Sequence, residues 1–296
     1  MTNRILDFSE LPARLRVNLR QLVVERREMP DVSMPLADLA VVIVSHPQVT
    51  YTQAVLAGLA EAGGTFVACN RRNLPVGMFL PLAAHHAQAR RFAAQARAPL
   101  PLRKRVWQQI VRAKIAAQAE TLLCLHGTDQ GLRALAGRVR SGDPQNVEAR
   151  AARRYWPLLF ADLDFRRHRE NEDQNLLLNY GYAVLRAVVA RAICGAGQHP
   201  CLGVHHHNRA NPFCLADDLM EPFRPTVDRA VAEYVGEHEI CNHVEASAKQ
   251  YLIEQMTGRY LIDGQQRTLF DVVARMACSL ADVFLGNAAR LDLPGG

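Results

Sequence analysis

The pattern of apolar residues changes near Leu80, and this change divides the chain into two parts of different structural class. Before it, apolar residues recur at every second position in short runs, which predicts strands. After it, they recur at every third or fourth position over long stretches, which predicts helices. We therefore expect an α+β protein in which a small β-rich domain precedes a larger all-α domain.

The first 80 residues form the predicted β-rich domain, 1–80. Alternating apolar and polar residues over 15–24 predict a hairpin or meander, and the run LAVVIV at 39–44 predicts a buried strand. Residues 52–62 predict one helix closed by Gly63-Gly64, and TFVAC at 65–69 predicts another strand.

A linker is predicted over 81–102, and the all-α domain over 103–296. Residues 85–98 are rich in Ala, Gln and Arg and favour a helix, which Pro99 and Pro101 interrupt. Further helices are predicted around 106–117 and over 148–155, 175–193, 217–223, 227–235, 246–256 and 269–285.

Positive charge is concentrated in one block of the chain. The net charge is +6, but the stretch from Pro81 to Arg169 holds 17 Lys or Arg against 6 Asp or Glu, or +11, which leaves −5 elsewhere. Such a block is typical of a protein that binds a polyanion. A general preference for Arg over Lys is an alternative, since only three lysines occur, but it does not explain the clustering.

Composition excludes several protein classes. The 296 residues contain no run of 18 apolar residues, and MTNRILDFSE lacks the apolar core of a signal peptide, so we expect a cytoplasmic protein with no membrane partner. The seven cysteines form no CxxC pair, which argues against a disulfide framework. A zinc site remains an alternative, and its candidate ligands are Cys194, Cys201, Cys214, Cys241 and His243.

The run Gly203–Pro225, GVHHHNRANPFCLADDLMEPFRP, is the densest group of candidate ligands. On a helix, Asp217 and Asp218 share a face with Glu221, because they precede it by four and three residues. Buried acids at this density need a cation or base to neutralise them, and imidazole with carboxylates suits a divalent metal. A solvated helix face beside a histidine loop is an equally weighted alternative.

Three further features have structural as well as functional interpretations. Glu148 opens a helix studded with arginine, where an acid ordinarily favours the helix dipole. Arg224, close to the acids, would either clamp a phosphate or balance their charge. Asn175 and Asn179 share a helical face, where such amides usually bond to buried groups. If a distant Glu, a His and a second Glu converge, they form a site for Mg²⁺ or Mn²⁺ that polarises a phosphodiester.

Three stretches of the helical part together resemble the CRISPR-associated protein 1 family, the integrases of spacer acquisition. They are VEARAARRYW, DQNLLLNYGYAVLRAVVARAI and LGVHHHNRANPFCLADDLMEPFRPTVD, and the last is most similar to the version found in type II systems. Residues 34–82 resemble the family's small domain. The resemblance implies a β-sandwich-like N-terminal domain, used for dimerisation, and an all-α catalytic domain.

The resemblance also implies the site residues. Glu148 matches the first acid, His206 the histidine of a G-x-x-H motif that starts at Gly203, and Glu221 the end of D-x-x-E. These three are the implied catalytic residues and metal ligands, for Mg²⁺ or Mn²⁺. Asp218 and Arg224 are supporting residues. The histidine triple leaves His205 and His207 as alternative registers.

The implied reaction is direct transesterification, in which the 3′-hydroxyl of a short DNA fragment attacks a phosphodiester at a CRISPR repeat boundary. The implied partners are DNA (protospacer fragments and the CRISPR repeat), a second copy in a homodimer, CRISPR-associated protein 2 and the type II effector nuclease. The basic stretch would hold phosphates, and its candidate DNA-binding residues are Arg150, Arg153, Arg154, Arg166 and Arg167.

Two other hypotheses remain at this point. One is a non-catalytic DNA-binding assembly module of the same complex, against which the presence of all three implied ligands argues. The other is a helical protein stabilised by zinc through the cysteine and histidine set.

Overall fold

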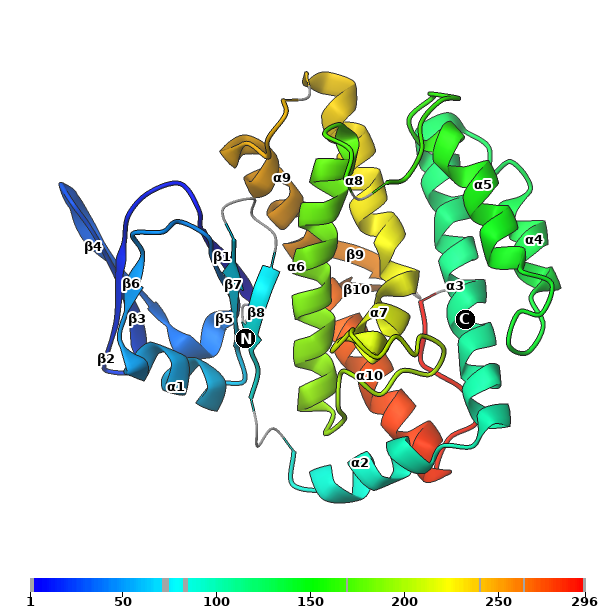
Figure 1. Cartoon of the computed structure of the whole chain (residues 1–296), viewed down its shortest axis with the longest axis horizontal. Helices are drawn as coiled ribbons and strands as arrows, with labels where there is room; N and C mark the ends of the chain where they lie inside the picture. Colours follow the sequence, from blue (N-terminus) through cyan, green and yellow to red (C-terminus); the bar gives the residue numbers. More distant parts are fainter. Residues whose placement is uncertain are drawn as a thin grey trace.

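The computed structural model of the chain describes residues 3–70, 75–81, 85–168, 170–239, 241–262 and 264–294. Figure 1 shows most strands gathered in the N-terminal part and most helices in the remainder, with the long helix α6 (Gln174–Gly195) between the N-terminal sheets and α8 (Arg224–Glu237), α3 (Leu100–His126) and α5 (Val147–Leu159). The fold is therefore α+β, as predicted.

The N-terminal part contains two four-stranded sheets. One has the order β1-β5-β7-β8, in which β8 is antiparallel to its neighbour, and the other has the order β4-β3-β2-β6. The elements are β1 (Arg4–Phe8), β2 (Arg14–Asn18), β3 (Gln21–Arg26), β4 (Met29–Pro35), η1 (Leu36–Asp38), β5 (Leu39–Val44), β6 (Thr50–Tyr51), α1 (Gln53–Glu61), β7 (Thr65–Cys69) and β8 (Pro75–Phe79).

The strand β5 explains why LAVVIV is apolar at every position. Val41 and Ile43 belong to the large core shared with the helices, whereas Leu39 and Val42 belong to the smaller core between the two sheets. A strand that is covered on both faces needs apolar residues on both, so its sequence loses the alternation of a half-exposed strand.

The remaining elements are mainly helices, and they include one hairpin that the sequence analysis did not predict. They are α2 (Gln88–Arg97), α3 (Leu100–His126), α4 (Leu132–Arg138), α5 (Val147–Leu159), α6, α7 (Cys214–Met220), η2 (Glu221–Phe223), α8 (Arg224–Glu237), α9 (Ala246–Thr257), the hairpin strands β9 (Arg259–Ile262) and β10 (Gln265–Thr268), and α10 (Leu269–Leu285). The predicted linker holds α2 and the start of α3. Helix α2 ends at Arg97 and α3 begins at Leu100, so the predicted interruption at Pro99 and Pro101 is confirmed. Both prolines lie at the start of α3, where the first turn needs no N–H from proline.

Helix α6 is the central helix of the larger core. It is long and apolar enough to cross a membrane, but 72% of its apolar window is buried inside the protein, as expected of a core helix. Gly181 lets α8 approach closely, since a Cβ at this position would lie 2.4 Å from Cγ1 of Val227.

Polar contacts join the N-terminal sheets to the helices. The Tyr180 hydroxyl donates to Asp7 Oδ2 at 2.5 Å, and Arg191 Nε donates to the carbonyl oxygen of Gly63 at 2.6 Å. Lys249 Nζ lies 2.9 Å from Glu10 Oε1. These contacts come from α6 and α9 and fix the two parts against each other.

A buried carboxylate joins α5, α6 and α8. Asp228, which is 1% exposed, accepts hydrogen bonds from Tyr155 at 3.1 Å and from Tyr182. Burial raises the pKa of the Asp228 carboxyl to about 7, although the hydrogen bonds from Tyr182 and Tyr155 act in the opposite direction.

Because the pKa of Asp228 is raised in the native protein, the free energy of unfolding should decrease as the pH rises. Between pH 5 and 7 the unfolded chain has released a proton that the native protein still holds, so the free energy of unfolding decreases by roughly 3 kcal/mol and levels off above pH 7. Asp228→Asn should remove this contribution. Urea denaturation of the wild type and of Asp228→Asn between pH 5 and 8 measures the difference in their free energies of unfolding. A difference that does not change over this pH range would contradict a raised pKa of Asp228.

Candidate active site

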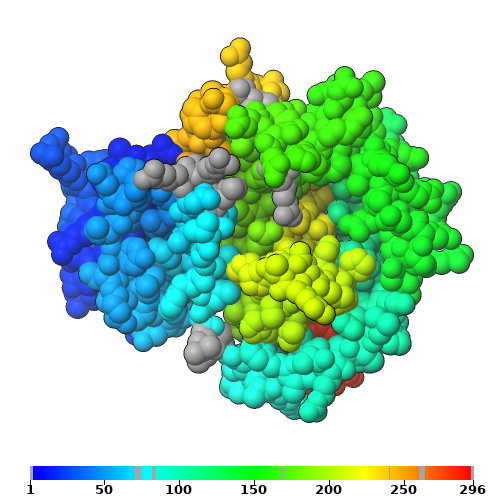
Figure 2. Space-filling view, in the orientation of Figure 1, coloured from blue at the N-terminus to red at the C-terminus, as the bar shows by residue number. Residues whose placement is uncertain are grey.

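The candidate site is built from four segments of the helical part. Helix α3 contributes Lys114, α5 contributes Glu148, and η2 contributes Glu221. The loop before α7 contributes Gly203–Asn208, which we call the histidine loop. In the space-filling view this segment (yellow) lies at the centre of the face, bordered by the α2–α3 segment (teal) and by α5 (green) (Figure 2).

Glu148 is fixed by the way α5 begins. The carboxylate of Asp143 accepts hydrogen bonds from the backbone N–H groups of Val147 and Glu148, both at 2.9 Å. Val147 is fully buried. Glu148 therefore lies in the first turn, where the helix dipole favours a negative charge.

Glu221 is a buried acid with two cationic partners. Its side chain is 7% exposed, and its oxygens lie 2.9 Å from Arg224 Nε and 2.5 Å from Lys114 Nζ. Burial by itself would raise the pKa of Glu221, but Arg224 and Lys114 outweigh it and lower the pKa to about 2. Glu221 is therefore ionised at neutral pH.

Lys114 joins the two glutamates, and the sequence analysis did not identify it. Its ammonium lies 2.6 Å from Glu148 Oε1 as well as 2.5 Å from Glu221 Oε2. The sequence did contain a signal for it. Lys114 is one of only three lysines in an arginine-rich chain, and it lies between Val111 and Ile115 in a stretch predicted to be an apolar helix.

Asp218 organises the histidine loop from beneath. This fully buried carboxylate accepts from the backbone N–H groups of Val204, His205 and His206 at 2.7, 2.9 and 3.2 Å. Gly203 is required here, since a Cβ would lie 2.4 Å from the carbonyl oxygen of His206 and 3.0 Å from Asp218 Oδ2. The G-x-x-H motif thus reflects a close approach of loop and acid.

The three histidines have different surroundings. His206 Nδ1 lies 2.5 Å from Asp218 Oδ1, and this hydrogen bond raises the pKa of His206. His205 stacks on Trp107 at a ring distance of 4.1 Å, and burial lowers its pKa. His207 lines a neighbouring cavity. His206 therefore has the pairing with a carboxylate that fixes a ligating imidazole and leaves Nε2 available.

The acids do not form a solvated helix face, so that alternative is wrong. Asp217, Asp218 and Glu221 are 8%, 0% and 6% exposed. Asp217 also has its own partners, Arg186 Nε and Asn211 Nδ2, each at 2.7 Å.

The donor set fits a divalent cation, although the three predicted ligands are not grouped around one point. Carboxylate oxygens and an oriented imidazole nitrogen suit Mg²⁺ or Mn²⁺, and the glutamate oxygens that such a cation would bind face the Lys114 ammonium. In the part of the chain that the structure describes, no three His, Cys, Asp or Glu residues form a group able to hold a metal. Within the same described residues, the cysteines and the histidine named for the zinc alternative do not form such a group either.

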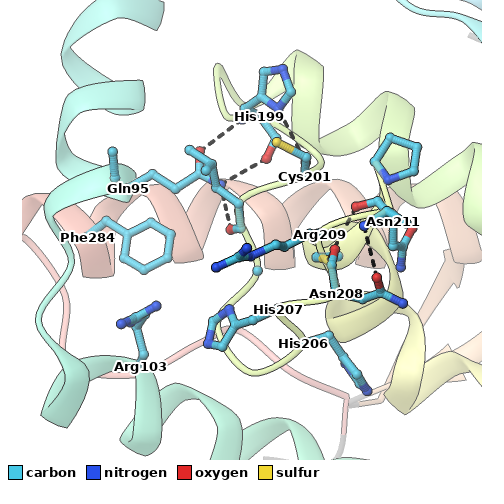
Figure 3. A pocket seen from close by; sticks show the side chains of 16 residues that line it. Gln95, Arg103, His199, Cys201, His206, His207, Asn208, Arg209, Asn211 and Phe284 are labelled. Atoms are coloured by element: carbon cyan, nitrogen blue, oxygen red, sulfur yellow. Dashed lines mark hydrogen bonds between the residues drawn. The ribbon is translucent and has the colours of Figure 1, made fainter.

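A cavity of about 700 Å³ adjoins the histidine loop. Figure 3 shows Gln95, Phe284 and Arg103 on one side of it, across from His207 and Arg209. His206 lines it as well, whereas the two glutamates do not. The cavity is therefore positively lined space beside the candidate site.

The five arginines predicted to bind DNA differ in their exposure and in their hydrogen bonds within the protein. Arg150, Arg153, Arg154 and Arg166 are exposed, and Arg154 also donates to the carbonyl oxygen of Gln130 at 2.9 Å. Arg167 is partly buried and donates to the amide oxygens of Asn175 and Asn179, both at 2.7 Å. The two asparagines thus have the structural role that their spacing suggested, and Arg167 is engaged within the protein.

Arg224 balances the acids in this structure. Its guanidinium pairs with Glu221 and lies 4.6 Å from the ring centroid of Tyr182. This arrangement agrees with the charge-balancing interpretation of the sequence.

Asp218→Asn should destabilise the protein by about 2–4 kcal/mol. Asp218 accepts three hydrogen bonds from backbone N–H groups of the histidine loop and one from the His206 ring, and an amide cannot accept all four. Urea denaturation at neutral pH measures the effect. The matched control is Asp292→Asn, which removes a surface pair with Arg275 and should cost less than about 1 kcal/mol. Equal effects of the two substitutions would contradict the role of Asp218.

Solved structures with the same fold cover nearly the whole chain. A casposase bound to integration product superposes with a TM-score of 0.79 at 18% identity, covering 99% of this chain and 93% of that one. A Cas6-RT-Cas1–Cas2 complex superposes with a TM-score of 0.74 at 19% identity, covering 98% of this chain and 36% of that one. At these identities the likeness establishes the fold.

Sequence comparison establishes the family. The family model described as "CRISPR associated protein Cas1" matches residues 9–266. The CRISPR-associated endonuclease Cas1 of Neisseria meningitidis serogroup C is 38% identical over 289 residues, which cover 95% of this chain and 92% of the relative. The chain therefore belongs to the Cas1 family of CRISPR-associated proteins.

Proposed function

We propose that this protein is a metal-dependent DNA integrase and endonuclease that joins short DNA fragments to a CRISPR array by 3′-hydroxyl transesterification. The observation that carries the proposal is the convergence of Glu148 and Glu221 on one ammonium group, 2.6 and 2.5 Å away. Beside them, Asp218 orients His206. Acids that converge in this way, next to basic surface, suit phosphodiester chemistry.

The proposed metal ligands are Glu148, Glu221 and Nε2 of His206. A bound Mg²⁺ or Mn²⁺ would stabilise the negative charge that develops on the phosphoryl oxygens. The chain's own residues prepare the ligands. Asp218 holds His206 in one orientation, Arg224 keeps Glu221 ionised, and Asp143 fixes the first turn of α5.

The proposed substrates are protospacer fragments and the CRISPR repeat. The stretch from Pro81 to Arg169 carries +11, and Arg150, Arg153, Arg154 and Arg166 are exposed within it. These side chains would contact phosphates and supply affinity without reading sequence. Arg167 would contribute indirectly, through its contacts with Asn175 and Asn179.

The proposed partners are a second copy of the chain, CRISPR-associated protein 2 and a type II effector nuclease. The structural neighbour that contains Cas1 together with Cas2 supports the second. The sequence NPFCLADDLMEPFRP supports a type II version, and an activity on the cell's own CRISPR array supports a cytoplasmic location.

A strand-joining assay tests the proposal. Purified protein, with and without its small partner, would be mixed with a short duplex bearing 3′-hydroxyl ends and a supercoiled plasmid carrying a repeat array, in Mn²⁺ or in EDTA. Joining should require the metal. It should fall by at least about 100-fold in Glu148→Gln, His206→Ala and Glu221→Gln, which each remove one ligand.

Matched variants make the result specific. Glu120→Gln changes an exposed glutamate of α3 that pairs with Arg133 and should retain joining. His205→Ala and His207→Ala should retain more activity than His206→Ala, and the opposite order would move the ligand within the triple. Retained DNA binding without joining in any metal or with the partner would instead favour the non-catalytic assembly module.

A further inference from the structure

A lysine occupies the space between the two glutamates that the proposed function assigns to a divalent cation. Lys114 Nζ contacts Glu148 Oε1 at 2.6 Å and Glu221 Oε2 at 2.5 Å, and its side chain is 14% exposed. Two carboxylates at ion-pair distance favour the protonated form of the lysine amine. The side chain is therefore an ammonium ion at neutral pH.

The two glutamates depend on this ammonium to different degrees. Glu221 has a second cationic partner in Arg224, 2.9 Å away. For Glu148 the ion pair with Lys114 is the salt bridge that the structure shows. Without Lys114, two carboxylates from different helices would face each other with one guanidinium beside Glu221, and like charges in a partly buried site are strongly unfavourable.

Helix α3, which carries Lys114, packs against the histidine loop. Trp107, two turns earlier on the same face of the helix, is 1% exposed and stacks on His205. The ammonium is thus carried by a packed helix that also contacts the histidine loop, and a cation that binds both glutamates must compete with it for the same oxygen atoms.

We propose that Lys114 is the internal counter-ion of the metal-free site, and that a divalent cation binds Glu148 and Glu221 by displacing its ammonium. The inference rests on the proposed function, because it takes these two glutamates as metal ligands. It explains how the carboxylates of Glu148 and Glu221 are tolerated side by side before metal binds. It also means that part of the metal's affinity is lost to the exchange.

Lys114→Met keeps a side chain of similar length and removes the charge. With the competing cation gone, Mn²⁺ should bind at least about tenfold more tightly than to the wild type. In EDTA the variant should unfold at a lower temperature than the wild type, since the carboxylates lose their counter-ion. Saturating Mn²⁺ should raise its melting temperature more than it raises that of the wild type.

Isothermal titration calorimetry and thermal unfolding of the full-length, metal-free proteins measure these effects. Lys104→Met, on an exposed position of the same helix, is the matched control and should bind Mn²⁺ as the wild type does. The double variant Lys114→Met with Glu148→Gln removes one charge of each sign. It should recover stability in EDTA relative to Lys114→Met, so a poorly folded single variant still leaves a test.

The outcomes separate this proposal from the proposed function. Wild-type or weaker Mn²⁺ affinity in Lys114→Met overturns the counter-ion role alone. A double variant as unstable in EDTA as Lys114→Met also overturns it. If neither the wild type nor Lys114→Met binds Mn²⁺, the metal site of the proposed function fails, and the displacement fails with it.

Discussion

Four carboxylates buried among the helices must each be neutralised or hydrogen-bonded, and the arrangement of the candidate site follows from how this is done. Asp217, Asp218, Glu221 and Asp228 are all less than 9% exposed. A buried charge without partners costs several kcal/mol, so each acid recruits groups from another segment. Asp217 pairs with Arg186 of α6, and Glu221 pairs with Lys114 of α3. Asp218 accepts hydrogen bonds from the histidine loop, and Asp228 accepts them from two tyrosines.

These pairings have a structural as well as a chemical consequence. Tyr155 lies on the same helix as Glu148, and Asp228 on the same helix as Arg224. The tyrosine contacts of Asp228 therefore fix α5 against α8, and with them the two glutamates of the site. Carboxylates carried by packed helices stay in place better than carboxylates carried by loops.

The sequence predicted much of this fold, since helical and strand periods are local. The hairpin over 15–24, the buried strand over 39–44 and the helices that carry Glu148 and Asp218 all appear close to their predicted bounds. Helix α4 and the hairpin β9–β10 were not predicted. Among the site residues, Lys114 was missed because its role depends on contacts with residues distant in sequence, which no local period encodes. The choice of His206 came from a family resemblance, and its physical basis, the hydrogen bond to buried Asp218, needs the three-dimensional structure.

The central claim is that Glu148, Glu221 and His206 gather around one divalent cation in place of the Lys114 ammonium. The most direct measurement is anomalous diffraction from a crystal of the protein soaked in Mn²⁺. The account predicts a manganese peak in contact with both glutamates and with Nε2 of His206, and the Lys114 ammonium moved away from them. Absence of manganese from these residues, at a concentration that saturates the protein in solution, would contradict it.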